Sequence, residues 1–257
     1  MEQFTPETTQ QVKTKNKVTS SSSFSYAKVY LWMTLGLVIT GLVAFFLPSL
    51  ITLMATQFSW SSETLGNVYL GLLIASAVLM LPAMFLITFK AWQPKSALMT
   101  ASYVFYTFLM GILLSSVFLT VLATSDSYGD YISTIGVSFL ITALSFLIMG
   151  LIGLFSKRNL GVLLPLLITL CLGSLTISLV NVFLRSPMIY WIIDFVSFAI
   201  ILIVTAIDMN RMKQLAENGG LSSETNIALY CAFNLYVDFI NIFLRVLYYV
   251  MASKNRK

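Results

Sequence analysis

The stretch that decides the fold is Val29–Leu53, VYLWMTLGLVITGLVAFFLPSLITL, which runs without a single charged residue. A helix needs about 20 consecutive apolar residues to cross the hydrocarbon core of a bilayer, and this stretch exceeds that length. Further mainly apolar runs of similar length follow it. The predicted spans are Val29–Leu53, Leu65–Thr88, Ala97–Leu122, Tyr131–Phe155, Leu160–Phe183, Met188–Ile207 and Asn226–Met251. The sequence therefore predicts an all-α integral membrane protein with seven transmembrane helices.

The composition supports the same class. Of the 257 residues, 58% are hydrophobic and only 10% are charged, with a mean hydropathy of +0.88. Soluble domains carry roughly 25% charged residues, and no soluble fold could bury this much apolar surface. We therefore expect a flexible polar tail over residues 1–26, one transmembrane domain over residues 27–252 and a short basic tail over residues 253–257.

The sequence contains no histidine. This absence excludes histidine-based zinc sites and the nucleophile systems that depend on a histidine base. It also excludes histidine as the pH-sensitive group, so carboxylates are left in that role. Two cysteines, Cys171 and Cys231, lie inside apolar runs and are expected to be buried, unpaired side chains.

The net charge of +5 comes from cations in the loops and tails, which is typical of topogenic charge rather than of a nucleic-acid-binding face. With seven spans, one side of the membrane collects most of these cations, and the positive-inside rule makes that side, with the N-terminus, cytoplasmic. They are Lys13, Lys15, Lys17, Lys28, Lys90, Lys95, Lys157, Arg158, Arg211 and Lys213. The cations Lys254, Arg256 and Lys257 conflict with this count, so either the tail lies outside or one span is re-entrant.

The seventh span carries a polar stripe, in which polar residues recur at intervals of four, four, three and four. Its members are Tyr230, Asn234, Asp238, Asn241 and Arg245. These spacings align them on one helical face over roughly 22 Å, at about 1.5 Å per residue. A polar face of that length is not expected to contact lipid. The prediction is therefore that the C-terminal helix lies at the centre of the bundle, surrounded by the others.

Three acids lie in or beside the last two spans, where an ionisable side chain is costly. Asp208 closes the sixth span and Asp238 lies in the middle of the seventh. The short connection keeps the two helices adjacent, so the two acids are expected to meet and to share a proton that is released near neutral pH. The alternative is a structural ion pair of Asp238 with Arg245 or Lys90.

Asp194 precedes Asp208 by almost four helical turns, or roughly 21 Å, so it cannot belong to the same site. It is interpreted either as an acid that attracts cations at the opposite mouth or as a solvated residue at a helix start. Lining residues are sought on the stripe and on the fifth span, where polar side chains recur at helical spacing. The candidate pore-lining residues are Asn234, Asn241, Ser178 and Asn181.

Several motifs resemble the Bax inhibitor (transmembrane Bax inhibitor motif) family, especially its bacterial members. They are VYLWM at Val29–Met33, IDMNR at Ile207–Arg211 and LYVDFINI at Leu235–Ile242. The resemblance implies a seven-helix fold with the last helix central and a pH-sensitive calcium leak in a bacterial plasma membrane. It implies that Asp208 and Asp238 gate the leak and contact the metal, with Lys90 as the nearest candidate for a basic latch.

Calcium takes 6 to 8 oxygen ligands, more than two carboxylates and two asparagines supply. Weak, transient binding is therefore expected, with no tightly bound cofactor, and lipid, calcium ions and protons are the expected partners. One alternative is a non-transporting interaction protein that modulates stress or cell death. Another is an intramembrane aspartyl protease, which would also use two aspartates. Because Leu235, Tyr236 and Val237 precede Asp238 in place of a glycine motif, we expect no enzyme.

Overall fold

The structure is a computed structural model, and it describes residues 26–91, 97–217 and 224–254. These residues form α1 (Tyr26–Gln57), α2 (Ser62–Lys90), α3 (Ala97–Thr124), α4 (Tyr128–Phe155), the 3-10 turn η1 (Leu160–Leu163), α5 (Leu164–Leu184), α6 (Pro187–Glu217) and α7 (Glu224–Lys254). Seven helices are long and apolar enough to cross a membrane, which confirms the predicted fold class. The predicted polar tail lies outside the described residues except for Tyr26, and only part of the basic tail is described.

The helix ends follow from local chemistry. The hydroxyls of Ser61 and Ser127 accept hydrogen bonds from the backbone N–H groups of Thr64 and Asp130, each at 3.2 Å, and so cap α2 and α4. Pro165 lies in the first turn of α5, where its missing N–H is tolerated, so it begins this helix rather than kinking it.

The sixth helix is longer than predicted, because α6 continues past Ile207 to Glu217. The added segment contains no glycine or proline to stop it, and its residues Met209 and Met212 are buried in the main core. Asp208 therefore lies inside α6 rather than at its end.

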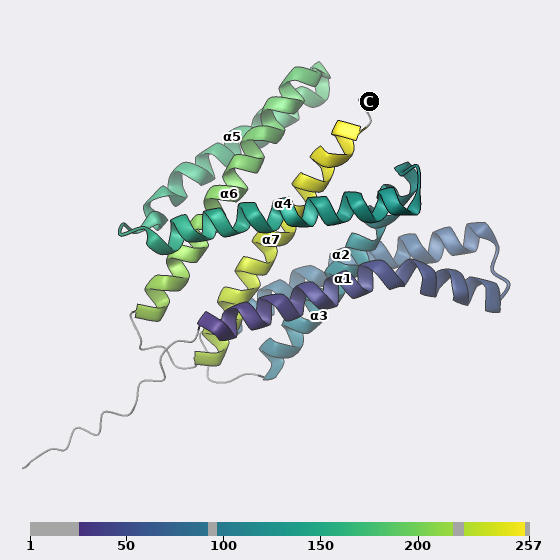
Figure 1. The fold of residues 1–257 in the computed structure, drawn as a ribbon, viewed down its shortest axis with the longest axis horizontal. Helices are drawn as coiled ribbons and strands as arrows, with labels where there is room; N and C mark the ends of the chain where they lie inside the picture. Colours follow the sequence, from purple (N-terminus) through teal and green to yellow (C-terminus); the bar gives the residue numbers. More distant parts are fainter. Residues whose placement is uncertain (1–25, 92–96, 218–223, 255–257) are drawn as a thin grey trace, which may run out of the picture.

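Figure 1 shows α7 (yellow) running between the α5–α6 pair and the group of α1, α2 and α3, with α4 across it. α7 packs against α1, α4 and α6 and makes smaller contacts with α2 and α3. In its apolar stretch 72% of the residues are buried, compared with 6% for α5, which packs against α6 and η1. α7 is thus the most buried of the seven helices.

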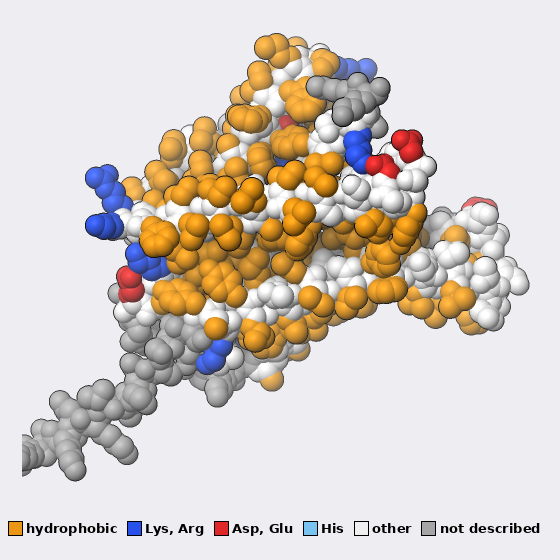
Figure 2. All heavy atoms as spheres, viewed as in Figure 1, with side chains coloured by type: hydrophobic (Ala, Val, Ile, Leu, Met, Phe, Trp, Pro, Cys, Tyr) orange, Lys and Arg blue, Asp and Glu red, His pale blue; other side chains and the backbone are white. Residues whose placement is uncertain are grey.

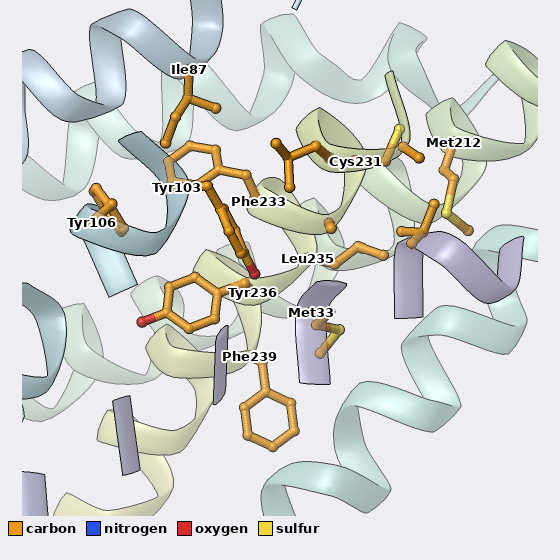
Figure 3. Packing of buried hydrophobic residues seen from close by; sticks show 14 of the residues in the cluster. Met33, Ile87, Tyr103, Tyr106, Met212, Cys231, Phe233, Leu235, Tyr236 and Phe239 are labelled. Atoms are coloured by element: carbon orange, nitrogen blue, oxygen red, sulfur yellow. The ribbon is translucent and has the colours of Figure 1, made fainter. Parts of the chain in front are cut away.

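Aromatic residues fill the core around α7. Figure 3 shows Tyr103 of α3 beside Tyr236 of α7, with ring centroids 6.2 Å apart. The hydroxyl of Tyr236 lies 2.6 Å from that of Thr40, and the Thr40 hydroxyl also donates to the carbonyl oxygen of Thr107 at 2.9 Å. These contacts join α1, α3 and α7 through a buried polar contact within an apolar core.

The outer surface suits a lipid environment. Figure 2 shows hydrophobic side chains over the long faces of the helices and charged side chains at the margins. Large apolar residues such as Phe155 and Phe183 are 78% and 84% exposed. A monomer in water would not expose so much apolar surface, whereas lipid tails accommodate it.

Each of the seven helices among residues 26–91, 97–217 and 224–254 is long and apolar enough to cross a membrane, so neither length nor composition requires a re-entrant segment there. Lys254, at the end of α7, binds Asp130 at the start of α4, and its ammonium also donates to the Thr134 hydroxyl at 2.6 Å. Since α4 starts on the side of the bundle opposite to the start of α1, α7 ends on that opposite side. The sequence analysis left two explanations for the cationic C-terminus. The structure favours the one in which seven helices cross the membrane and the C-terminal tail lies on the side opposite to the N-terminus.

Candidate functional site

The two predicted gating acids lie on neighbouring antiparallel helices. Near one end of the hairpin, the guanidinium carbon of Arg211 on α6 lies 5.9 Å from the ring centroid of Tyr230 on α7. Near the other end, Asp194 on α6 forms an ion pair with Arg245 on α7. These two contacts fix the register of the helices, and Asp208 and Asp238 both lie between them.

Asp208 and Asp238 lie close enough for the charge of one carboxylate to act on the other. Asp238 is only 5% exposed, and its Oδ2 atom has no hydrogen-bond partner among the described residues. Asp208 is half-buried and also lies within electrostatic reach of Arg211 and of the buried Cys231. A buried carboxylate without full hydrogen bonding is costly, so this pair is a place where a proton or a cation would be stabilised.

Arg245 does not form the predicted ion pair with Asp238, because its partner is Asp194. Asp194 is 4% exposed, so its interpretation as a solvated residue at a helix start is wrong. The reason is the register of the hairpin, which places the start of α6 beside the last turns of α7. Its role as a mouth residue stays a prediction.

The latch candidate Lys90 ends α2, and its carbonyl oxygen accepts a hydrogen bond of 3.3 Å from the side chain of Asn226 on α7. Asn226 precedes Asp238 by roughly 18 Å along the helix, at about 1.5 Å per residue. The backbone of Lys90 therefore lies more than three helical turns from the level of Asp238. A role for Lys90 as a latch stays a prediction.

The polar stripe lies along the least buried face of α7. Asp238 is its deepest member, Asn234 and Arg245 are half-buried, and Asn241 is exposed. This differs from the expectation that the whole stripe is enclosed. The apolar faces of α7 occupy the contacts with α1, α3 and α4, and the polar face lies beside α6, where Tyr230 contacts Arg211 and Arg245 pairs with Asp194.

The fifth helix does not bring its polar residues to this stripe. Ser178 is exposed, and Asn181 binds the backbone of Ser186, accepting at 3.0 Å and donating at 3.2 Å. Asn181 thus closes the turn after α5, which packs against α6 and η1. Cys171, also on α5, is exposed rather than buried, while Cys231 is buried as expected, and both are free thiols.

Within the described residues, no group of three or more Asp, Glu, Cys or His side chains could hold a metal ion. The carboxylates of Asp208 and Asp238 are the acidic oxygens that this part of the hairpin offers to a cation. Such a small ligand set suits weak binding.

A family model described as inhibitor of apoptosis-promoting Bax1 matches residues 23–256 of the sequence. The chain belongs to this family. It is 30% identical to the inner membrane protein YbhL of Escherichia coli over 225 residues, covering 86% of this chain and 88% of YbhL. It is also 28% identical to an uncharacterized protein of Borreliella burgdorferi, covering 89% and 92% of the two chains, and 25% identical to an uncharacterized membrane protein of Streptococcus pyogenes, covering 86% and 90%.

One positioning residue of this Bax inhibitor family member was missed by the sequence analysis. Asn210, two residues after Asp208, is 2% exposed, and its side-chain amide donates to the carbonyl oxygen of Gly153 at 3.1 Å. Its Oδ1 atom accepts from the backbone N–H of Leu160 at 3.0 Å. Asn210 therefore ties α6 to the end of α4 and to η1. The place of Asn210 in the IDMNR motif, two residues after Asp208, was the available signal.

Proposed function

We propose that this integral multi-pass membrane protein is a pH-sensitive calcium leak, gated by the Asp208–Asp238 pair. One observation carries the proposal. Two carboxylates interact electrostatically between neighbouring helices, and one of them is buried with an unpartnered oxygen among the described residues. Ionisable residues inside a membrane domain are rare and mark ion or proton pathways.

Weak binding at this pair fits passage better than storage. Calcium prefers 6 to 8 oxygen ligands, and two carboxylates with water supply an incomplete shell. An ion that binds weakly leaves quickly, which conduction requires. In this proposal Asn234 and Asn241, on the open face of α7, supply further oxygens along the route.

Protonation is the proposed switch. A proton shared by Asp208 and Asp238 removes negative charge from the hairpin and changes the packing of α6 against α7. Among the described residues, Arg211 acts on Asp208, and Cys231 lies near Asp208 and Arg211. Proton occupancy of the pair therefore controls both its affinity for a cation and the separation of the two helices.

We place the protein in a bacterial inner membrane, with its N-terminus in the cytoplasm. The relative from Escherichia coli is named an inner membrane protein, and the cations of the loops favour this orientation. In the same proposal the protein is not an enzyme, and lipid, calcium ions and protons are its partners.

Reconstitution tests the proposal. Purified protein in vesicles that contain a calcium-sensitive dye is compared with Asp208→Asn and Asp238→Asn over a range of pH. We expect protein-dependent calcium flux that varies with pH, and a loss of that pH dependence in either variant. Asp126→Asn is the matched control, because Asp126 is an exposed acid in the loop before α4.

Two results would contradict the leak. Absence of flux from folded wild-type protein would favour a non-transporting interaction protein. Cleavage of a membrane-spanning peptide, lost in both Asp208→Asn and Asp238→Asn, would favour an aspartyl protease.

A further inference from the structure

A second polar cluster lies in the other half of the α6–α7 hairpin, away from Asp208 and Asp238. Asp194 is 4% exposed and pairs with Arg245, whose side chain is 35% exposed. The contact joins α6 to the polar stripe of α7. The pair thus links the buried carboxylate of Asp194 to the partly exposed guanidinium of Arg245.

Aromatic rings lie beside this ion pair. The ring of Tyr249 on α7 stacks on Trp191, with centroids 6.4 Å apart, and meets Phe198 edge-on at 5.6 Å. Trp191 and Phe198 lie about one turn before and one turn after Asp194, so all three share one face of α6. Tyr249 and Arg245 therefore cover the same turn of α6, with Asp194 at its middle.

The polar groups of this cluster are incompletely satisfied. The Oδ2 atom of Asp194 and the hydroxyl of Tyr249 are buried and have no hydrogen-bond partner among residues 26–91, 97–217 and 224–254. The ion pair with Arg245 is thus the main contact that holds the Asp194 carboxylate. A fully bonded network would make this part of the hairpin rigid, and the cluster lacks one. The ion pair is therefore the contact on which the closure of this end depends.

Arg245 also belongs to the same helical face as Asp238 and lies about 10 Å from it along the axis of α7. A cation moving along this face from Asp238 therefore meets the guanidinium of Arg245. Fixed positive charge on a narrow route excludes cations.

We propose that Asp194 and Arg245 form an ion-pair lock that closes the contact between α6 and α7 at the end opposite to Lys90. The lock holds α6 against α7 and keeps the charge of Arg245 on the cation route. Breaking the pair separates the two helices at this end and exposes the half-buried Ser197, which lies about one turn after Asp194 on α6, to water. The role in cation passage rests on the proposed leak, whereas the closing contact itself does not.

Thiol labelling tests the lock without any calcium measurement. The substitution Ser197→Cys is made together with Cys171→Ser, and the rate of modification by a water-soluble maleimide is measured in vesicles. We expect Asp194→Asn and Arg245→Gln each to raise this rate about tenfold, a typical size for a coupling between two states. Arg245→Lys keeps the charge and should leave the rate close to that of the parent.

Controls separate the lock from a purely structural contact. The parent without Ser197→Cys gives the background from the buried Cys231. If a single variant fails to give a monodisperse protein, the double variant Asp194→Arg/Arg245→Asp is used instead. It exchanges the two charges, keeps the ion pair and should restore slow labelling. Equal labelling of the parent, Asp194→Asn and Arg245→Gln, with only their thermal stability lowered, would overturn the lock.

Calcium flux in the same vesicles separates the two proposals. Flux that rises with labelling in Asp194→Asn and Arg245→Gln supports both the lock and the leak. Faster labelling without flux in any protein, wild type included, would overturn the leak and leave the lock standing. Flux that is unchanged while labelling rises would overturn the role of Arg245 as a barrier.

Discussion

Replacing Gly153 with alanine would add a methyl group where α4 approaches α6 beside the gating acid. The new Cβ atom would lie 2.8 Å from the Cβ of Met209 and would also meet the backbone carbonyl oxygen of Ala206. Neither atom is the end of a flexible side chain, so the helices must move apart. Met209 follows Asp208 directly, and the shift would therefore be transmitted to the site.

The expected magnitude follows from these contacts. Overpacking of a tight core site costs about 1–3 kcal/mol. Helix propensity favours alanine over glycine by about 1 kcal/mol, which offsets part of that cost. The net loss in the free energy of unfolding is about 0–2 kcal/mol, or up to roughly 8 °C in the midpoint of thermal unfolding for a chain of this length.

The assay is thermal unfolding in detergent, with Gly136→Ala as the matched control. Gly136 also lies in α4, but a Cβ atom there would have nothing within 4 Å, so this variant should be as stable as wild type or more stable. Equal unfolding temperatures for Gly153→Ala and Gly136→Ala would refute the close approach of α4 to α6 beside Asp208.

Three further substitutions test contacts described above. Thr40→Val removes the hydroxyl that contacts Tyr236, and thermal unfolding should show a loss of about 1–3 kcal/mol, because a buried polar partner is left unsatisfied; an unchanged stability would contradict this contact. Asn210→Leu should destabilise the protein by a similar amount and also alter calcium flux, whereas a loss of stability without any change in flux would limit Asn210 to the fold. Lys254→Gln should cost at most about 1 kcal/mol, because its ion pair with Asp130 is partly exposed, and the cost should fall as salt is added.

The seven helices could be predicted from the sequence because apolar length is a local property. The alignment of Tyr230, Asn234, Asp238, Asn241 and Arg245 on one face of α7 was equally local, since it depends only on helical periodicity. The closeness of Asp208 to Asp238 also followed from a short connection between consecutive helices. These predictions required no knowledge of how the other helices are packed.

The partner of Arg245 could not be predicted in the same way. It depends on the register of α6 against α7, which is set by side-chain packing along the whole hairpin and places Arg245 beside Asp194. The exposure of Asn241 has a similar origin, because the periodicity of α7 does not say which of its faces the other helices cover. The exposure of Ser178 could not be predicted either, because the helical spacing of the polar residues on α5 does not say which helices lie beside them.

The most buried helix of this protein is also the one that follows all the others in the chain. During synthesis α1 to α6 enter the membrane before α7 is available to fill the space between them, so they must wait as a partly open assembly with an unfilled apolar interior. Completion of α7 is therefore the event that consolidates the bundle. A chain whose synthesis stops before Asn226 would leave a membrane intermediate whose inner aromatic surface is exposed to proteases and chaperones.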